Sequence, residues 1–320
     1  MIVNNEKKSK KREVRALLLM SGGLDSLLAA KILAVQEIDV TLLCFKSYFF
    51  DCSEASKAAK QIGFNLRVVD FSKKQLEIVK NPRHGRGKAI NPCIDCHLLM
   101  LIWAKEIMER EDFDFIATGE VLEERPMSQN KRALELIERE AGLEGKLLRP
   151  LSAKLLDETE AEKKGIVERA KLEAISGRSR SRQLELAVHF GIKKIPQPSG
   201  GCILTEKNYT EKLEKLLENK KDINESDVKL LSSGRVFWEG EVLVVVARNE
   251  GECQNLEKLA KPGDFQFFPQ NFSGPTVLIR NFGTKDDKKN LKEAGKSYVF
   301  KYSKKIPPEA KILVIHNENL

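Results

Sequence analysis

The chain has 320 residues, of which 41% are hydrophobic and 32% are charged. This length suits two domains with substantial cores, and the composition excludes a disordered or collagen-like chain. The net charge of +8 at pH 7 fits an anionic partner such as RNA, although many proteins without such a partner carry a similar charge. No apolar run approaches the roughly 20 residues of a membrane helix, so we expect no membrane association. Six cysteines in a chain of this length do not make a small secreted disulfide scaffold, so we expect a cytoplasmic location.

The first two thirds of the chain alternate between apolar runs typical of strands and segments with helical periodicity. Strands are expected at residues 14–20, 40–45, 65–71 and 113–118, and helices at 25–35, 53–62, 96–109, 131–140, 158–172 and 181–190. This alternation predicts an α/β fold in which a parallel sheet carries helices on both faces.

The pattern changes near residues 219–227. Short β-rich runs and helical segments follow, at 242–247, 249–260, 276–279, 285–294 and 312–315. They predict a small α+β module. We therefore expect a basic tail at residues 1–13, an α/β domain at 14–222 and a C-terminal module at 223–320.

The segment from Ser21 to Ser26 lies between the first expected strand and helix, where a phosphate site belongs in an open α/β sheet. Gly22 and Gly23 let the backbone and the helix dipole approach an anion closely, and the two serine hydroxyls can donate. Asp25 would be repelled by bare phosphate, so we expect it to bind Mg²⁺. A tight turn with a serine or aspartate cap is the structural alternative. The hexapeptide resembles the pyrophosphate loop of the PP-loop ATPases, which implies ATP and Mg²⁺ as cofactors and cleavage to AMP and pyrophosphate.

Three cysteines have settings suited to chemistry. Cys93 and Cys96 form a CxxC pair, which can share a metal or cycle through a disulfide. Cys202 follows two glycines. Three thiolates on a 4Fe–4S cluster would leave one iron open for sulfide, and we favour this interpretation. A persulfide or disulfide route, and a structural zinc with His97 as a ligand, remain alternatives. Cys44, within a strand, is expected to be a small core residue.

A third segment follows the strand at 113–118. Thr118, Gly119 and Glu120 open a polar loop that reaches Ser128 and Gln129, and the residues alone predict only a possible active-site loop. With the later Leu-Arg-Pro-Leu at 148–151, the segment resembles the adenylating domain of tRNA 4-thiouridine synthetases over roughly residues 14–205. The resemblance implies a nucleotide hydrolase-like PP-loop fold, with Thr118, Gly119 and Glu120 among the cofactor-binding residues.

The cysteine pattern is similar to that of the tRNA 2-thiouridylases, in which a cysteine after Asn-Pro and a later Gly-x-Cys cysteine carry the sulfur chemistry. Cluster-dependent relatives use a CxxC pair and one distant cysteine. The resemblance thus implies Cys93, Cys96, Cys202 and Asp25 as catalytic residues. No N-terminal RNA-binding extension is evident. No C-terminal rhodanese-like domain is evident either, which favours sulfur delivery to a cluster.

Candidate RNA contacts lie in three places. A basic loop carries Arg83, Arg86 and Lys88, and the approach to a helix carries Arg178, Arg180 and Arg182. Residues 231–248 resemble an NFACT-type RNA-binding module, and the basic span 280–311 that follows could contact phosphates. A solvated surface is the alternative for each.

These features together predict an ATP-dependent tRNA sulfurtransferase that adenylates a uridine and replaces its oxygen with sulfur, with 4-thiouridine favoured. The expected partners are tRNA and a sulfur donor, either sulfide or a desulfurase product, and a homodimer is possible. The alternatives are 2-thiouridine synthesis, an amide- or nitrile-forming PP-loop ligase acting on a small molecule, and a non-catalytic RNA-binding protein.

Overall fold

The structure is a computed structural model that describes residues 13–196, 202–283 and 288–317. The expected tail, apart from Glu13, and the two glycines before Cys202 lie outside these ranges. The chain forms two compact units: unit 1 comprises residues 1–87 and 91–201, and unit 2 comprises 88–90 and 202–320. The division falls earlier than the expected boundary at 222, because helix α8 (Lys207–Asn219) groups with the C-terminal residues.

Unit 1 is built on a parallel sheet of five strands in the order β3-β2-β1-β4-β5. Their bounds are β1 Arg15–Leu19, β2 Asp39–Lys46, β3 Leu66–Asp70, β4 Phe115–Thr118 and β5 Leu147–Leu148. The central strand β1 pairs in parallel with both β2 and β4, so the strand order reverses beside it. The carboxyl ends of β1 and β4 therefore meet at a topological switch point, the usual ligand site of such sheets.

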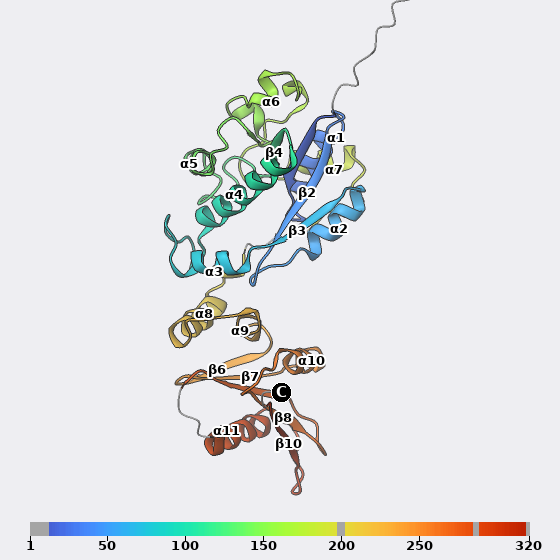
Figure 1. The fold of residues 1–320 in the computed structure, drawn as a ribbon. Coiled ribbons are helices and arrows are strands. Elements are labelled where there is room, and N and C mark those ends of the chain that lie inside the picture. Colours follow the sequence, from blue (N-terminus) through green and yellow to red (C-terminus); the bar gives the residue numbers. More distant parts are fainter. Residues whose placement is uncertain (1–12, 197–201, 284–287, 318–320) are drawn as a thin grey trace, which may run out of the picture. The chain divides into compact units, whose positions relative to one another are not determined.

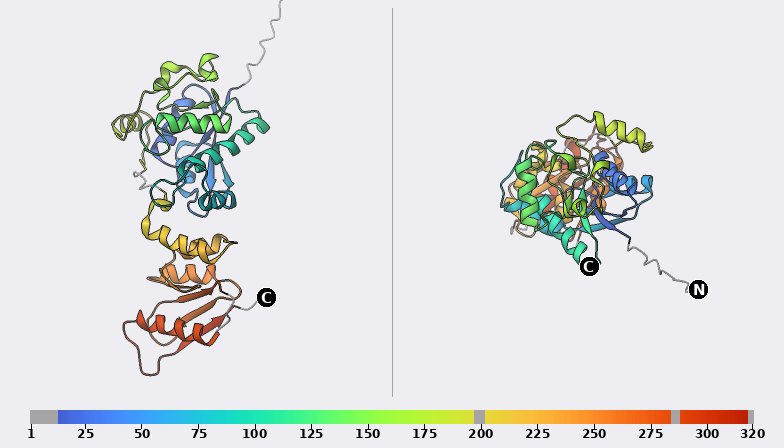
Figure 2. Two further views of the ribbon diagram at one scale, coloured as in Figure 1. Left: turned by 90° about the vertical axis from the view of Figure 1, so that its left-hand side faces the viewer. Right: turned by 90° about the horizontal axis from the view of Figure 1, so that it is seen from above.

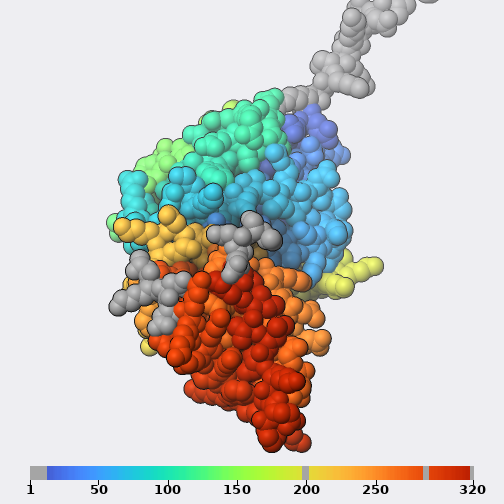
Figure 3. All heavy atoms as spheres, turned by 60° about the horizontal axis from the view of Figure 1, so that its bottom comes forward, coloured from blue at the N-terminus to red at the C-terminus, as the bar shows by residue number. Residues whose placement is uncertain are grey.

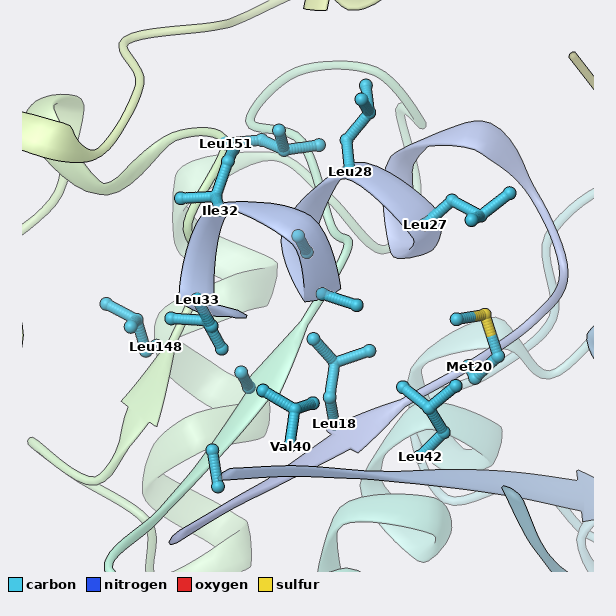
Figure 4. Close-up of a cluster of buried hydrophobic side chains, with 14 of the residues drawn as sticks. Leu18, Met20, Leu27, Leu28, Ile32, Leu33, Val40, Leu42, Leu148 and Leu151 are labelled. Atoms are coloured by element: carbon cyan, nitrogen blue, oxygen red, sulfur yellow. The ribbon is translucent and has the colours of Figure 1, made fainter. Parts of the chain in front are cut away.

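Helices cover both faces of this sheet, as the alternation predicts (Figure 1). Their bounds are α1 Leu24–Ala34, α2 Ser53–Ile62, α3 Ser72–Lys80, α4 Cys93–Glu111, α5 Lys131–Ala141, α6 Glu160–Lys163 and α7 Ser181–His189. Leu18 of β1 packs in one core cluster with α1, α2 and α7, whereas Leu17 packs in a second cluster with α4 and α5. Figure 4 shows α1 above the strands, with Leu33 on the side of the helix that faces them. Each such buried leucine stabilises the fold by about 1.5–3 kcal/mol.

The expected helix at 158–172 is wrong in extent. Only α6 and a 3-10 turn at Arg169–Lys171 form there. Gly165, at φ 67°, takes the left-handed conformation that commonly ends a helix.

A disulfide links Cys44, in the core, to Cys52, the residue that precedes α2, with the Cα atoms 6.1 Å apart. The prediction that Cys44 is a small core residue is confirmed, but the sequence analysis did not predict its disulfide bond to Cys52. Cys93, Cys96, Cys202 and Cys253 do not take part in a disulfide. The cysteines proposed for sulfur chemistry therefore keep their thiol groups.

Unit 2 has a five-stranded antiparallel sheet in the order β10-β8-β9-β7-β6. The strands are β6 Arg235–Glu239, β7 Val242–Val246, β8 Phe265–Pro269, β9 Val277–Asn281 and β10 Ile312–His316, and the remaining helices are α9 Glu225–Leu230, α10 Glu250–Leu259 and α11 Lys288–Lys301. Helix α11 lies against one face of this sheet (Figure 2). Gly295 makes this close approach possible, since a side chain there would collide with the Phe267 ring. The predicted α+β module is confirmed.

Arg280 is buried inside unit 2, although the sequence placed it on a basic surface. Its guanidinium donates to Asp264 (Nε–Oδ1 2.9 Å) and to Asp227 (Nη1–Oδ1 2.7 Å). Both carboxylates are buried as well. Arg280 is thus the centre of a buried ion-pair network. The basic surface of this segment consists instead of exposed lysines on and after α11, in the part of the chain coloured red in Figure 3. No helix within the described ranges is long and apolar enough to cross a membrane.

Candidate active site

The turn between β1 and α1 has the geometry of an anion site. Gly22 lies at φ 87°, and a Cβ atom there would stand 2.5 Å from the backbone nitrogen of Ala55 in the first turn of α2. Ser26 Oγ donates to the carbonyl of Gly23 (2.9 Å), which holds the turn closed. The first N–H groups of α1 have no acceptor within the helix, so they and the helix dipole are available to a phosphate.

The loop after β4 lies directly against this turn. A side chain at Gly119 would collide with the backbone of Asp25 and Ser26. The structure therefore brings together two segments that the sequence singled out separately, at the switch point between β1 and β4.

Two carboxylates lie in this region. Oδ1 of Asp25 is buried without a hydrogen-bond partner among the described residues. Burial raises the pKa of Asp25, although a hydrogen bond from Gln183 opposes the rise. Burial and the negative charge of Asp25 also raise the pKa of Glu124. A pair of half-buried carboxylates, one of them with an unpartnered oxygen, suits a hard cation such as Mg²⁺, which takes oxygen ligands. Sequence reasoning missed Glu124, although it lies in the segment that follows Glu120.

Arg125 and Arg180 supply positive charge at the same place. Both lower the pKa of Asp25 and of Glu124, against the larger effect of burial. The charge of Arg125 also lowers the pKa of the Cys93 thiol, which burial raises. The carboxylate pair and the CxxC segment therefore share one electrostatic environment. Arg180, predicted to contact RNA, is placed where it could hold nucleotide phosphates.

Glu120 is a buried anchor in this structure. Its carboxylate contacts His97 Nδ1 at 2.8 Å and accepts hydrogen bonds from Arg149 Nε (3.1 Å) and Thr118 Oγ1 (3.1 Å). Arg149 belongs to the Leu-Arg-Pro-Leu segment, so the two motifs meet physically. The predicted cofactor contacts Thr118 and Glu120 are engaged with the protein itself, and Gly119 between them supplies the close approach to α1.

The Glu120 network predicts a loss of stability in acid. Burial alone would raise the pKa of Glu120, but the hydrogen bond from His97 and the charge of Arg149 lower it from 4.5 to about 2. A lowered pKa stabilises the fold above the unfolded value, so the free energy of unfolding should fall as pH drops from 4.5 towards 2. Glu120→Gln should be less stable at pH 7 and should show a shallower decline in acid. Urea unfolding across this pH range measures both, and Glu135→Gln, at an exposed carboxylate of α5, is the control. Parallel curves for Glu120→Gln and the parent protein would contradict the assignment.

The polar pair that ends the loop has unused hydrogen-bonding capacity. Ser128 Oγ and Gln129 Oε1 are buried and have no partner among the described residues. Buried polar groups are normally satisfied, so each such atom needs an explanation such as a ligand or an ordered water.

Cys93 and Cys96 lie in the first turn of α4, on one face of the helix. Cys96 is buried and its sulfur accepts from Gln75 Nε2 (3.3 Å). Asp95, between them, accepts from the backbone N–H groups of Arg83 and His84 (3.2 and 2.9 Å), which anchors the basic loop beside the cysteines.

The third proposed cysteine, Cys202, belongs to unit 2, whereas the CxxC pair belongs to unit 1. Within the described ranges, no group of three or more His, Cys, Asp or Glu side chains is arranged to hold a metal. Thiol chemistry at all three positions suits an iron–sulfur cluster, but each unit by itself presents only part of the ligand set.

The basic residues predicted to contact RNA differ in their availability. Arg86 donates to the carbonyls of Val79 and Lys80 at the end of α3. Arg182 is paired with Glu173 and Glu185. Those two guanidiniums therefore have local structural roles. Lys88 and Arg178 are exposed, and Arg83 is exposed beside Glu140 at 3.2 Å.

Comparisons with known proteins cover both units. Residues 14–157 match the model of a family of unknown function (DUF7411), and residues 234–319 match the NFACT protein RNA binding domain. The tRNA-specific 2-thiouridylase MnmA of Karelsulcia muelleri is 28% identical over 128 residues, which are 36% of this chain and 33% of that protein. MnmA of Rhizobium rhizogenes is 29% identical over 139 residues, 37% and 34% of the two proteins. The chain thus spans about a third of the length of these relatives.

Two solved structures are also similar. A predicted subunit of tRNA methyltransferase from Methanocaldococcus jannaschii has a TM-score of 0.32 and 22% identity, covering 43% of this chain and 69% of that one. The NMN synthetase of Francisella tularensis has a TM-score of 0.32 and 10% identity, covering 68% and 82%. The glycine-bearing loop at the switch point of a parallel sheet and the similarity to the 2-thiouridylases support the predicted resemblance to the PP-loop ATPase superfamily.

Proposed function

We propose that the protein is an ATP-dependent tRNA sulfurtransferase that adenylates a uridine and replaces its oxygen with sulfur. The observation that carries the proposal is the close contact between the two predicted segments, since a side chain at Gly119 would collide with the backbone of Asp25 and Ser26. The charge of Arg125 also lowers the pKa of both Asp25 and Cys93, against the larger effect of burial. Sequence similarity to 2-thiouridylases supports the same reaction class. The matched RNA-binding domain supports tRNA as the partner.

ATP is proposed to bind at the turn from Ser21 to Ser26. The N–H groups of the turn and of the first turn of α1 would hold the phosphates, and Asp25 and Glu124 would hold Mg²⁺. Arg125 and Arg180 would compensate the negative charge that develops when the α-phosphate is attacked.

The chemistry requires two displacements. The uridine carbonyl oxygen attacks the α-phosphorus of ATP, the bond from this phosphorus to the bridging oxygen breaks, and pyrophosphate leaves. A sulfur nucleophile then bonds to the activated ring carbon, and AMP departs with the original oxygen. The target base must leave its stack to reach a buried site, so a flexible or flipped nucleotide is expected.

Cys93, Cys96 and Cys202 are proposed to manage the sulfur. A 4Fe–4S cluster on these three thiolates would present sulfide at an iron without a protein ligand. A persulfide on one cysteine is the alternative route. We favour 4-thiouridine because of the Thr-Gly-Glu and Leu-Arg-Pro-Leu segments, whereas the similarity to 2-thiouridylases favours 2-thiouridine as the second candidate. A cytoplasmic location, a desulfurase-derived or free sulfide donor and a homodimer complete the proposal.

Anaerobic purification tests the cluster. The protein should be brown, with iron and sulfide in about a 4:4 ratio. Cys93→Ala, Cys96→Ala and Cys202→Ala should each lose the chromophore, whereas Cys253→Ala, at a free thiol of α10, should keep it. A colourless protein with stoichiometric zinc would overturn the cluster but leave the persulfide route, which Cys96→Ser would then block.

A further inference from the structure

Three aromatic side chains gather where β6 meets α11 in unit 2. The Phe237 ring lies 5.1 Å from the Tyr298 ring and 5.9 Å from the Tyr302 ring, centroid to centroid, at interplanar angles of 36° and 30°. Phe237 also contacts the core beneath. The two tyrosines lie four residues apart, on one edge of α11. The cluster therefore consists of one tilted and one stacked ring pair, and all three partly buried rings are held in place by the core of unit 2.

Two exposed cations lie over these rings. Lys301 Nζ is 5.9 Å from the Phe237 centroid and 5.7 Å from each tyrosine centroid. Arg235 Cζ is 5.1 Å from the Tyr302 centroid. Both cations are solvent-exposed. A ligand can therefore displace the two side chains from the rings, and a negative charge on that ligand can pair with Lys301 and Arg235.

A cavity of about 250 Å³ continues along the same edge of α11. It is lined by Glu239, Glu241, Val242, Asn281, Gly283, Asn290, Leu291 and Ala294. Tyr298 Oη donates to Glu239 Oε1 (2.9 Å), which joins the cavity to the aromatic cluster. The cavity is smaller than the roughly 300–1,000 Å³ of pockets that enclose whole small molecules, so it suits one end of a ligand.

We propose that this groove binds unpaired RNA nucleotides, whose bases stack on Tyr298 and Tyr302 and whose phosphates pair with Lys301 and Arg235. The inference rests on the proposed function for RNA as the partner and goes beyond it by selecting single-stranded RNA over duplex. Duplex RNA hides its base faces, whereas stacking on aromatic rings needs bases splayed from the helix. The carboxylates of Glu239 and Glu241 would repel phosphates, so the cavity suits the amino edge of a base, which donates to carboxylates.

The test is equilibrium binding of the full chain to a fluorescein-labelled, unstructured 12-nucleotide RNA, with a fully paired RNA duplex as competitor. Tyr298→Leu combined with Tyr302→Leu should weaken binding by roughly 5- to 100-fold with little change in salt dependence. Lys301→Ala should weaken binding and lower the slope of log K against log salt by about one. Lys296→Ala removes the same charge about 200° around α11 from Tyr298 and is the matched control. Tyr298→Phe keeps the ring without the bond to Glu239, so it should still bind if the rings stack and the variant folds.

The proposal is overturned if the double tyrosine variant, folded by circular dichroism, binds as the parent does, or if duplex competes as well as single strand. Binding of ATP in the absence of RNA, measured on the same variants, separates this groove from the nucleotide site: it should persist when stacking is lost. A parent protein that binds single strands but never thiolates tRNA would refute the reaction and leave the groove.

Discussion

Replacing Asp25 with asparagine is expected to reduce ATP-dependent pyrophosphate release by on the order of 10²–10³-fold. The change removes a charged ligand from the proposed Mg²⁺ site while keeping the shape of the side chain. Radioactive pyrophosphate exchange into ATP measures the loss. Glu124→Gln should also lower exchange, whereas Glu123→Gln, at the exposed neighbouring carboxylate, should not.

The stability of Asp25→Asn distinguishes a role in the reaction from a role in the fold. A carboxyl whose pKa is raised by burial destabilises the folded state at pH values above its unfolded pKa. Asp25→Asn should therefore be at least as stable as the parent at pH 7 while it loses activity. An inactive variant that is also unfolded would point to a structural role for Asp25, and an active one would remove it from the site.

Replacing Arg280 with alanine is expected to destabilise unit 2 by about 3–5 kcal/mol. The substitution leaves the buried carboxylates of Asp227 and Asp264 without the guanidinium that neutralises both. Lys258→Ala, at an exposed lysine of α10, should change stability by less than about 0.5 kcal/mol.

Tryptophan fluorescence can follow unit 2 alone. The chain has two tryptophans, Trp103 in α4 of unit 1 and Trp238 in β6 of unit 2. In a Trp103→Phe background, urea unfolding of Arg280→Ala should therefore show a lower midpoint in the Trp238 signal. An unchanged midpoint would mean that water or Lys261, which also contacts Asp227, replaces the guanidinium without cost.

Local sequence patterns predicted most of the architecture. The alternation of strands and helices gave the parallel sheet, because each apolar strand needs a helix on either side to cover it. Gly22 and Gly23, which follow the first strand, indicated the position of the ligand site at the carboxyl ends of the strands. The expected helix at 158–172 failed because its apolar periodicity continues past Gly165, whose backbone conformation ends α6.

Site residues within one contiguous segment could be predicted from the sequence, whereas contacts between distant segments could not. Ser21 to Ser26 and the CxxC pair are contiguous, so their chemistry could be inferred. Glu120 was expected to contact the cofactor, and only the fold reveals that His97 and Arg149 occupy its oxygens. Charges such as Arg280 look alike in sequence whether they face solvent or a buried aspartate.

Nucleoside analysis of tRNA tests the central claim most directly. Unmodified tRNA is incubated anaerobically with the protein, Mg–ATP and sulfide, then digested and analysed by liquid chromatography and mass spectrometry. A thiolated uridine should form with the parent protein and be absent with Asp25→Asn, with Cys96→Ser or without ATP. AMP and pyrophosphate formation without any thiolated nucleoside, and independent of tRNA, would contradict the account and indicate a ligase acting on a small molecule.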